Sequence, residues 1–374
     1  MGLRVGLVTP RFSPSVGGVQ TVVERLAEAL AERACEVDVL TQATRAASGA
    51  EWRGLYRVLR FALAVRSDRF PLAPGLVAHL RAYSSRYDVV HVHDYHSASA
   101  IAATAVSQAP VVFSPHYHGG GHTPAARLLH VVHRPLARRV FAAVPELIVV
   151  SRAEQTLLEA DFPDWRGRRT VIPNGADILA IRAAAPQPAG TPVVLIATRL
   201  EAYKRVAQAI DAFAAADPDA RLVVLGGGPE QARLRERAAP LGDRVVIAGQ
   251  VPLDELRSWL RSAAVVVTLS EHEAFGLTVV EGLAAGARVV ASDIAAHREV
   301  RAYGAPWVDL VAPDADAATI GRVIRGALEA PRPLRDLALP TWDDAASRVL
   351  AVYERVSSRP TASRPSTTSD HQRR

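Results

Sequence analysis

The sequence predicts an α/β protein with two Rossmann-like, doubly wound parallel-sheet domains that face each other across a central cleft. Short apolar runs alternate with amphipathic segments of helical period along most of the 374 residues. The runs are apolar throughout, as in parallel strands that helices cover on both faces. A Pro-containing segment over residues 180–190 interrupts the pattern, which then restarts. Because the chain also exceeds the size of one ordinary core, two domains are expected.

The first predicted domain covers residues 1–178. Val19, Val22 and Leu26 recur at helical spacing, so a helix is expected directly after the loop that contains Gly17 and Gly18. Residues 41–86 lack a clear period and are expected to form short helices. The predicted strands are 3–9, 36–40, 87–93, 110–116, 146–151 and 169–175, with further helices starting near residues 97 and 123.

The second predicted domain covers residues 179–340, and two further segments follow it. Residues 341–357 are expected to form a helix that packs back toward the first domain, and the tail 358–374 is predicted to be disordered because it has no apolar period. Ligands bind such sheets beyond the carboxyl ends of the strands, which predicts a site in the cleft. The predicted strands of this domain are 193–197, 221–226, 244–249, 264–269 and 287–292.

Composition argues against several classes of protein. No apolar run reaches the length of a bilayer span, and the first residues lack the architecture of a signal peptide. Cys35 is the only cysteine, so an internal disulfide is excluded and a cytoplasmic location is expected. Residues 1–178 contain 20 Arg against 15 acidic residues, a surplus too small to indicate a nucleic-acid partner.

Residues 51–70 mix large apolar side chains with five arginines. A basic amphipathic helix of this kind can lie on an anionic membrane, which would bring the protein to the inner face of the membrane as a peripheral contact. The favoured interpretation is a helix that covers the first domain and keeps its arginines in solvent.

Lys204 is the one lysine among 44 basic residues. It follows Arg199 by five positions, in a loop after the predicted strand 193–197, so both cations are expected at the mouth of the cleft. A departing diphosphate gains charge as its bond to a sugar breaks, and two fixed cations stabilise that charge most in the transition state. The alternative is a surface pair at a helix N-terminus, where cations are unfavourable unless an anion binds.

The stretch 270–293 contains two carboxylates, Glu273 and Glu281, around a predicted loop-to-helix junction. Gly276 permits close approach of the backbone to a ligand, and the free N–H groups at a helix start favour a phosphate or a hydroxyl. Glu281, inside the helix, can accept hydrogen bonds from a ribose diol. A capped helix with two solvated glutamates is the alternative, and we favour the binding site.

Three blocks, IPNGAD (172–177), TRLEAYK (198–204) and EAFGLTVVE (273–281), resemble the signature blocks of family 4 of the retaining glycosyltransferases, which have the GT-B fold. The resemblance runs in order from the Gly17-Gly18 loop to about residue 300. It implies that His116 lies beside the anomeric centre, that Arg199 and Lys204 bind the diphosphate and that Glu281 binds the ribose. The residues implied in catalysis are His116, Glu273, Arg199 and Lys204.

The resemblance also implies the remaining site. Residues on the acceptor side are His93, Asp94 and His118. Donor-binding residues are Gly17, Gly18, Arg199, Lys204, Gly249, Val251, Glu273, Ala274, Phe275, Gly276, Leu277, Thr278 and Glu281. The activity expected is transfer of a sugar from a nucleoside-diphosphate sugar of UDP or GDP type to a hydroxyl of a sugar, lipid or small natural product. Members retain anomeric configuration and need neither metal nor cofactor.

The sequence departs from the family pattern at three positions. Thr198 stands where Gly usually precedes Arg-Leu, Arg205 where Gly often follows the Lys, and Gly227 where Asp is common. We expect these changes to tune donor choice rather than to abolish activity.

The same residues bear on rival functions. The histidine clusters around His93 and His116 match no standard zinc spacing. The Asp217/Asp219 and Asp314/Asp316 pairs are predicted in turns or caps away from the ligand edge. The glycines at 226–228 fail the dinucleotide fingerprint, because Pro229 and Gln231 follow. A sugar-nucleotide epimerase and a non-catalytic nucleotide-sugar binding protein remain as alternatives on the same fold.

Overall fold

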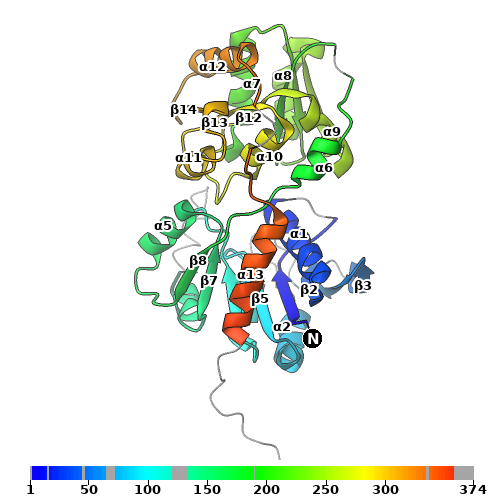
Figure 1. Ribbon diagram of the computed structural model, residues 1–374, viewed down its shortest axis with the longest axis vertical. Helices are drawn as coiled ribbons and strands as arrows, with labels where there is room; N and C mark the ends of the chain where they lie inside the picture. The colour runs from blue at the N-terminus through cyan, green and yellow to red at the C-terminus, as the bar shows by residue number, and fades with distance from the viewer. Residues whose placement is uncertain are drawn as a thin grey trace, which may run out of the picture.

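The computed structural model describes residues 2–14, 17–43, 47–64, 72–119, 134–188, 190–333 and 337–357. Two α/β units lie one above the other, each with its own sheet (Figure 1). The tail 358–374, predicted to be disordered, and the helix expected near residue 123 fall outside the described residues.

The first unit is built on an eight-stranded sheet of order β3-β4-β2-β1-β5-β6-β7-β8. All neighbouring strands are parallel except β3 and β4, which are antiparallel. The strands are β1 (Arg4–Thr9), β2 (Glu36–Ala43), β3 (Gly49–Arg53), β4 (Tyr56–Ala62), β5 (Val89–His93), β6 (Val111–Ser114), β7 (Glu146–Val149) and β8 (Arg168–Val171). Its helices are α1 (Gly18–Glu32), α2 (Pro74–Tyr83), α3 (Ala98–Val106), a helix over 134–142 and α5 (Arg152–Asp161).

The prediction of short helices over residues 41–86 was wrong for most of the segment. β3 and β4 form a hairpin there, and α2 is the only α-helix among the described residues of this segment. The helix expected over 51–70, on a membrane or on the first domain, is therefore also wrong for residues 51–62, while 65–70 lie outside the described residues. Tyr56 and Val58 point into the core, whereas the large apolar side chains of Trp52 and Leu55 are exposed. Apolar residues therefore lie on both the buried and the exposed side of the hairpin, which hides the alternation that indicates a strand.

The second unit has a six-stranded, fully parallel sheet of order β11-β10-β9-β12-β13-β14. Numbered from β9, this is the doubly wound order 3-2-1-4-5-6, so the topological switch point lies between β9 and β12. The strands are β9 (Val193–Ala197), β10 (Arg221–Leu225), β11 (Val245–Gly249), β12 (Ala263–Thr268), β13 (Arg288–Ser292) and β14 (Val308–Val311). Its helices are α7 (Val206–Ala216), α8 (Gln231–Ala238), α9 (Leu253–Ser262), α10 (Leu277–Ala285), α11 (Ala295–Arg301) and α12 (Ala317–Glu329).

Both sheets are covered on two faces, as their continuous apolar strands require. Val193 and Leu195 of β9 pack in one hydrophobic cluster, while Val194 and Ile196 pack in another on the opposite face. β1 divides in the same way, because Leu7 and Val8 belong to different clusters. Apolar side chains on both faces therefore fix each sheet between two helical layers.

The chain passes between the two units twice. α6 (Ile178–Ala183) follows the first passage and occupies the start of the segment expected as a linker. α13 (Trp342–Ser357) follows the second and packs against α1 and β5 of the first unit (Figure 1, red helix). Ala176 and Thr341 are paired by an isolated bridge, so the two passages lie side by side. No helix within the described residues is both long and apolar enough to cross a membrane.

Tyr353 of α13 is fully buried, and its hydroxyl lies 2.6 Å from Nδ1 of His91 in β5. Tyr353→Phe removes that partner and leaves a buried ring nitrogen unsatisfied. We expect it to lower the free energy of unfolding by about 1–3 kcal/mol, measured by urea denaturation. Tyr83→Phe, on the half-exposed Tyr83, is the matched control and should change little. Equal stability of the two variants would contradict the buried bond.

Candidate active site

A cavity of about 970 Å³ lies between the two units. Its walls are the loops that follow β1, β5 and β6 in the first unit and β9, β10, β11 and β12 in the second. Parallel strands bring their carboxyl ends to one edge of the sheet, so the two binding edges face each other. The cavity contains most of the predicted site.

Lys204 and Glu273 meet at the switch point of the second sheet. Lys204 ends the short 3₁₀ turn η3 (Ala202–Lys204) after β9, and Glu273 lies in the loop after β12. The ammonium Nζ is 2.6 Å from Oε1 of Glu273, and both side chains are largely buried. Burial acts to raise the pKa of Glu273, but Lys204, together with smaller contributions from His297 and Ser270, outweighs burial and the net pKa is lowered. Glu273 is therefore ionised near neutral pH.

Arg199 lies on the same wall, with its guanidinium held in place by two neighbours. Nη1 lies 2.8 Å from a carboxylate oxygen of Glu201, and Nη2 donates to the Tyr203 hydroxyl at 3.1 Å. The Lys204 ammonium lies 5.1 Å from the centre of the Tyr203 ring. Tyr203 thus supports both predicted cations, a role that sequence analysis did not assign to it.

Arg205, directly after Lys204, has a left-handed backbone with φ 55°. This conformation favours glycine, which is the residue the family pattern has here. The chain keeps an arginine instead, whose guanidinium hydrogen-bonds the carbonyl of Pro313. The departure noted in the sequence therefore falls on a strained position that a long-range contact stabilises.

The loop of residues 273–277 leads into α10. Gly276 is left-handed at φ 105°, and a Cβ on it would lie 3.0 Å from the ring of the buried His297. Glycine is thus needed both for conformation and for space. The members of the predicted set that line the cavity here are Glu273, Ala274, Phe275, Gly276, Leu277, Thr278 and Glu281.

Glu281 is partly buried on α10, near Asp177 at the first passage between the units. Burial and, secondarily, the negative charge of Asp177 raise the pKa of Glu281 to about 7. Asp177 itself is bound by Arg25 of α1 and Arg257 of α9, each at 2.7 Å. The free protein therefore holds Glu281 at the edge of ionisation, where a ligand that donates hydrogen bonds favours the charged form.

The first unit contributes two strained residues to the cavity. Asp94, after β5, has φ 77°, and His116, after β6, has φ 49°. Non-glycine residues in this region are uncommon and cluster at functional sites. Burial raises the pKa of Asp94 to about 6 and lowers the pKa of His116 to about 4. His118 also lines the cavity, as do Gly17 and Gly18 at the start of α1.

Two predicted residues lie outside the cavity lining. His93 is fully buried behind His116, with Nδ1 at 3.1 Å from Nε2 of His116. Gly249 ends β11, and its carbonyl accepts a bond from Gly226 N–H at 2.7 Å, while Val251 does line the cavity. Lining residues that were not predicted include Arg11, Asn174 and Gln250. Arg11 and Gln250 both closely follow strand ends, and that position is the signal that could have found them.

Direct contacts join the first unit to the loop of residues 273–277 and to α11. The Ser151 hydroxyl, at the N-cap of α5, donates to the carbonyl of Ala274 at 2.5 Å. The backbone N–H groups of Arg152 and Ala153 donate to the two carboxylate oxygens of Glu299 on α11, at 2.9 and 3.0 Å. A carboxylate at a helix N-terminus is favourable, so this contact helps to hold the units together.

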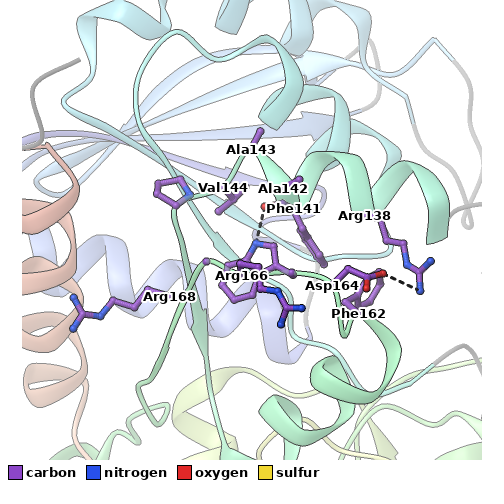
Figure 2. Close-up of a pocket in the computed structure, with 12 residues that line it drawn as sticks. Arg138, Phe141, Ala142, Ala143, Val144, Phe162, Asp164, Arg166 and Arg168 are labelled. Atoms are coloured by element: carbon purple, nitrogen blue, oxygen red, sulfur yellow. Dashed lines mark hydrogen bonds and ion pairs between the residues drawn. The ribbon is translucent and has the colours of Figure 1, made fainter. Parts of the chain in front are cut away.

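A second hollow, of about 900 Å³, lies in the first unit and contains none of the predicted residues (Figure 2). It is lined by Arg138, residues 141–145, Phe162 and residues 164–168, at the amino ends of β7 and β8. The Trp165 indole N–H donates to the carbonyl of Phe141 at 2.7 Å. Among the side chains that the structure describes, no three His, Cys, Asp or Glu groups converge as metal ligands, here or in the interdomain cavity.

Glu281→Gln tests the raised pKa of Glu281. A carboxyl with a raised native pKa stabilises the fold below its unfolded pKa of about 4.5, and that contribution is lost as pH rises through about 7. Glutamine stays neutral at both pH values. The free energy of unfolding of Glu281→Gln, relative to that of wild type, should therefore rise by about 1–2 kcal/mol from pH 5 to pH 8, after allowance for solvent screening. Chemical denaturation at both pH values measures this. Glu236→Gln, on the exposed face of α8, should show no such trend, and a pH-independent difference for Glu281→Gln would contradict the burial.

Comparison with known families finds two consecutive matches. Residues 16–178 match the family described as Glycosyltransferase Family 4, and residues 177–338 match Glycosyl transferases group 1. The phosphatidyl-myo-inositol mannosyltransferase of Mycolicibacterium smegmatis is 29% identical over 95% of this chain and 94% of its own. The D-inositol 3-phosphate glycosyltransferase of Xylanimonas cellulosilytica is also 29% identical, over 96% and 98%.

Solved structures share the fold at low identity. Sucrose-phosphate synthase from Thermosynechococcus elongatus superposes with a TM-score of 0.73 at 21% identity, covering 94% of this chain and 98% of its own. HepE of Anabaena, in complex with UDP and glucose, superposes with a TM-score of 0.68 at 22% identity, covering 95% of each chain. The two parallel-sheet units and their facing edges are those of the GT-B fold. With the two consecutive family matches, they show that this chain belongs to family 4 of the glycosyltransferases.

Proposed function

We propose that this glycosyltransferase moves a hexosyl group from a nucleoside-diphosphate sugar to an acceptor hydroxyl, with retention of configuration and without a metal. Residues 1–178 present the acceptor and residues 179–340 bind the donor. The observation that carries the proposal is the set of charges at the switch point: Arg199 and Lys204 on one loop, Glu273 on the next, and Glu281 further along α10.

The charges fit the parts of such a donor. Arg199 and Lys204 line the wall where a diphosphate would sit, and both are fixed by neighbours before any ligand arrives. Pre-positioned cations stabilise the charge that grows on the leaving phosphate, because they need no rearrangement during the reaction. Glu281 accepts the ribose hydroxyls, and Glu273 with the rest of the loop 273–277 holds the sugar. The UDP named with the Anabaena structure supports a nucleotide in this kind of cleft.

The chemistry then needs no protein nucleophile. The bond between the anomeric carbon and the phosphate oxygen breaks as the acceptor oxygen bonds to the same face of the sugar. The proton of the acceptor hydroxyl passes to the leaving phosphate oxygen, so atoms and charge balance. Closure of the two units keeps water, the competing acceptor, away from the donor.

An inositol-type polyol is the acceptor class that we propose, because the names of both curated relatives contain inositol. Asp94 and His118 on the first wall are the polar side chains proposed to bind its hydroxyls. A contact with a membrane surface would follow only if the inositol belongs to a lipid.

Lys204→Met and Glu281→Gln should separate the two ends of the nucleotide. Calorimetric titration in EDTA should detect binding of UDP or GDP to wild type. Lys204→Met should weaken the affinity for the nucleoside diphosphate by about 10- to 100-fold, the value of one or two charge-assisted hydrogen bonds. Its affinity for the nucleoside without phosphates should be unchanged. Glu281→Gln should weaken the affinity for the nucleoside and the affinity for the nucleoside diphosphate by the same factor. Arg233→Met and Glu236→Gln, both on exposed side chains of α8, are matched controls. Metal-dependent binding, or equal losses in the controls, would overturn the assignment.

Turnover decides between transfer and the alternatives. Wild type is incubated with the sugar nucleotide of the base that binds, UDP or GDP type, and with myo-inositol or its phosphate. It should form a glycoside that has the anomeric configuration of the donor, which NMR measures. An epimerase would convert the donor sugar without an acceptor, and a binding protein would leave it intact. Either of those results would contradict the proposed transfer.

A further inference from the structure

A chain of buried polar side chains leads from the last helix to the cleft. Tyr353 bonds Nδ1 of His91, and Nε2 of His91 lies 2.8 Å from the Ser114 hydroxyl. The ring of His91 packs against that of His93, with centres 4.1 Å apart, and His93 bonds His116. His91 and His93 are fully buried, and only His116 reaches the cavity. The mechanism above uses none of the residues behind His116.

All three rings are neutral near pH 7. Burial lowers the pKa of His91 to about 3 and that of His116 to about 4, and burial with the neighbouring rings holds the pKa of His93 well below its usual range. Each ring therefore has one proton, on one of its two nitrogens. Which nitrogen holds it follows from the partners that the ring has.

The partners of His93 select its tautomer. Nδ1 faces Nε2 of His116 at 3.1 Å, while Nε2 of His93 is buried and has no hydrogen-bond partner among the described residues. A proton on Nε2 would be a buried N–H without an acceptor, which native proteins rarely contain. With the proton on Nδ1, His93 donates to His116 and leaves only a lone pair without a partner. We assign the proton to Nδ1 on this ground.

The tautomer of His93 dictates that of His116. Nε2 of His116 accepts the bond from His93, so it has no proton, and the neutral ring must hold its proton on Nδ1. Within the described residues, Nδ1 of His116 has no hydrogen-bond partner and is not among the buried atoms that lack one, so it is accessible, and His116 lines the cavity. The bond from His93 holds the ring from its opposite, buried side. The cavity consequently meets an N–H group rather than a lone pair.

We propose that His93 is a positioning residue that makes His116 a hydrogen-bond donor toward the cleft. His116 then binds an oxygen of the sugar or acceptor and does not take the proton of the attacking hydroxyl. The role of the two histidines rests on the proposed function, whereas the tautomer itself does not.

The tautomer can be read directly in the free protein. A long-range ¹H–¹⁵N correlation spectrum of histidine-labelled protein distinguishes the two neutral forms, and His116→Gln identifies the signals of His116 by their loss. We expect an Nδ1-protonated, neutral ring at pH 7. A proton on Nε2 of His116, or a charged ring, overturns the proposal whatever the protein binds.

Three replacements of similar size test the direction of the bond. Asn at position 93 can donate an N–H to His116, Asp can only accept, and Leu can do neither. We expect His93→Asn to retain kcat within about tenfold, and His93→Asp and His93→Leu to lose at least 100-fold. His93→Asp should also convert His116 to the Nε2-protonated form and raise its pKa, so its rate-pH profile gains an ionisation of His116 that is absent from the wild-type profile near neutral pH. Thermal melts show whether each variant folds.

The outcomes distinguish a failure of the positioning role of His93 from a failure of the proposed transferase function. If His93→Asp is as active as His93→Asn while His93→Leu is inactive, the bond runs the other way and the proposal fails. Equal activity of all three, or equal loss in all three, also overturns a positioning role. Nucleotide affinity should be unchanged in the three variants, because His93 lies in the first unit. If wild type binds no nucleotide, the proposed function fails while the spectrum still decides the tautomer.

Discussion

The bond between Lys204 and Glu273 is the interaction on which the geometry of the cleft depends. It joins the loop after β9 to the loop after β12, the two strands between which the order of the second sheet reverses. A backbone bond from the N–H of Glu271 to the carbonyl of Tyr203, at 2.9 Å, joins the same two loops. A largely buried ion pair is strongly directional, because either charge left alone would be costly. The pair therefore fixes Arg199 and the start of α10 relative to each other before a ligand enters.

The first unit is attached to this arrangement through backbone groups. Ser151 bonds the carbonyl of Ala274, and the N-terminus of α5 binds Glu299. Asp177 holds Arg25 on one side and Arg257 on the other. A carboxylate at the passage between the units thus neutralises cations from both while its charge disfavours ionisation of Glu281. Contacts between the units and the ionisation of Glu281 are consequently linked through Asp177.

Much of this could be predicted from sequence, for definable reasons. β9 spans the predicted residues 193–197, because a strand buried on both faces is apolar from end to end. The hairpin of β3 and β4 was missed because Trp52 and Leu55 are exposed, so hydrophobicity there does not report burial. Arg199, Lys204 and Glu273 were found through their position after strands. The proximity of Asp177 to Glu281 and the place of His93 behind His116 depend on residues about 100 and 23 positions apart, and local pattern does not encode such pairings.

The two passages of the chain between the units lie side by side at Ala176 and Thr341, and the N–H of Ala176 also bonds the carbonyl of Pro340 at 3.0 Å. Two paired segments resist twisting and shear more than one segment does. The orientation of one unit relative to the other is therefore restrained more than a single connection would restrain it. Any rotation about these paired segments would move residues beside them, such as Asp177, least and the far edge of the cleft most.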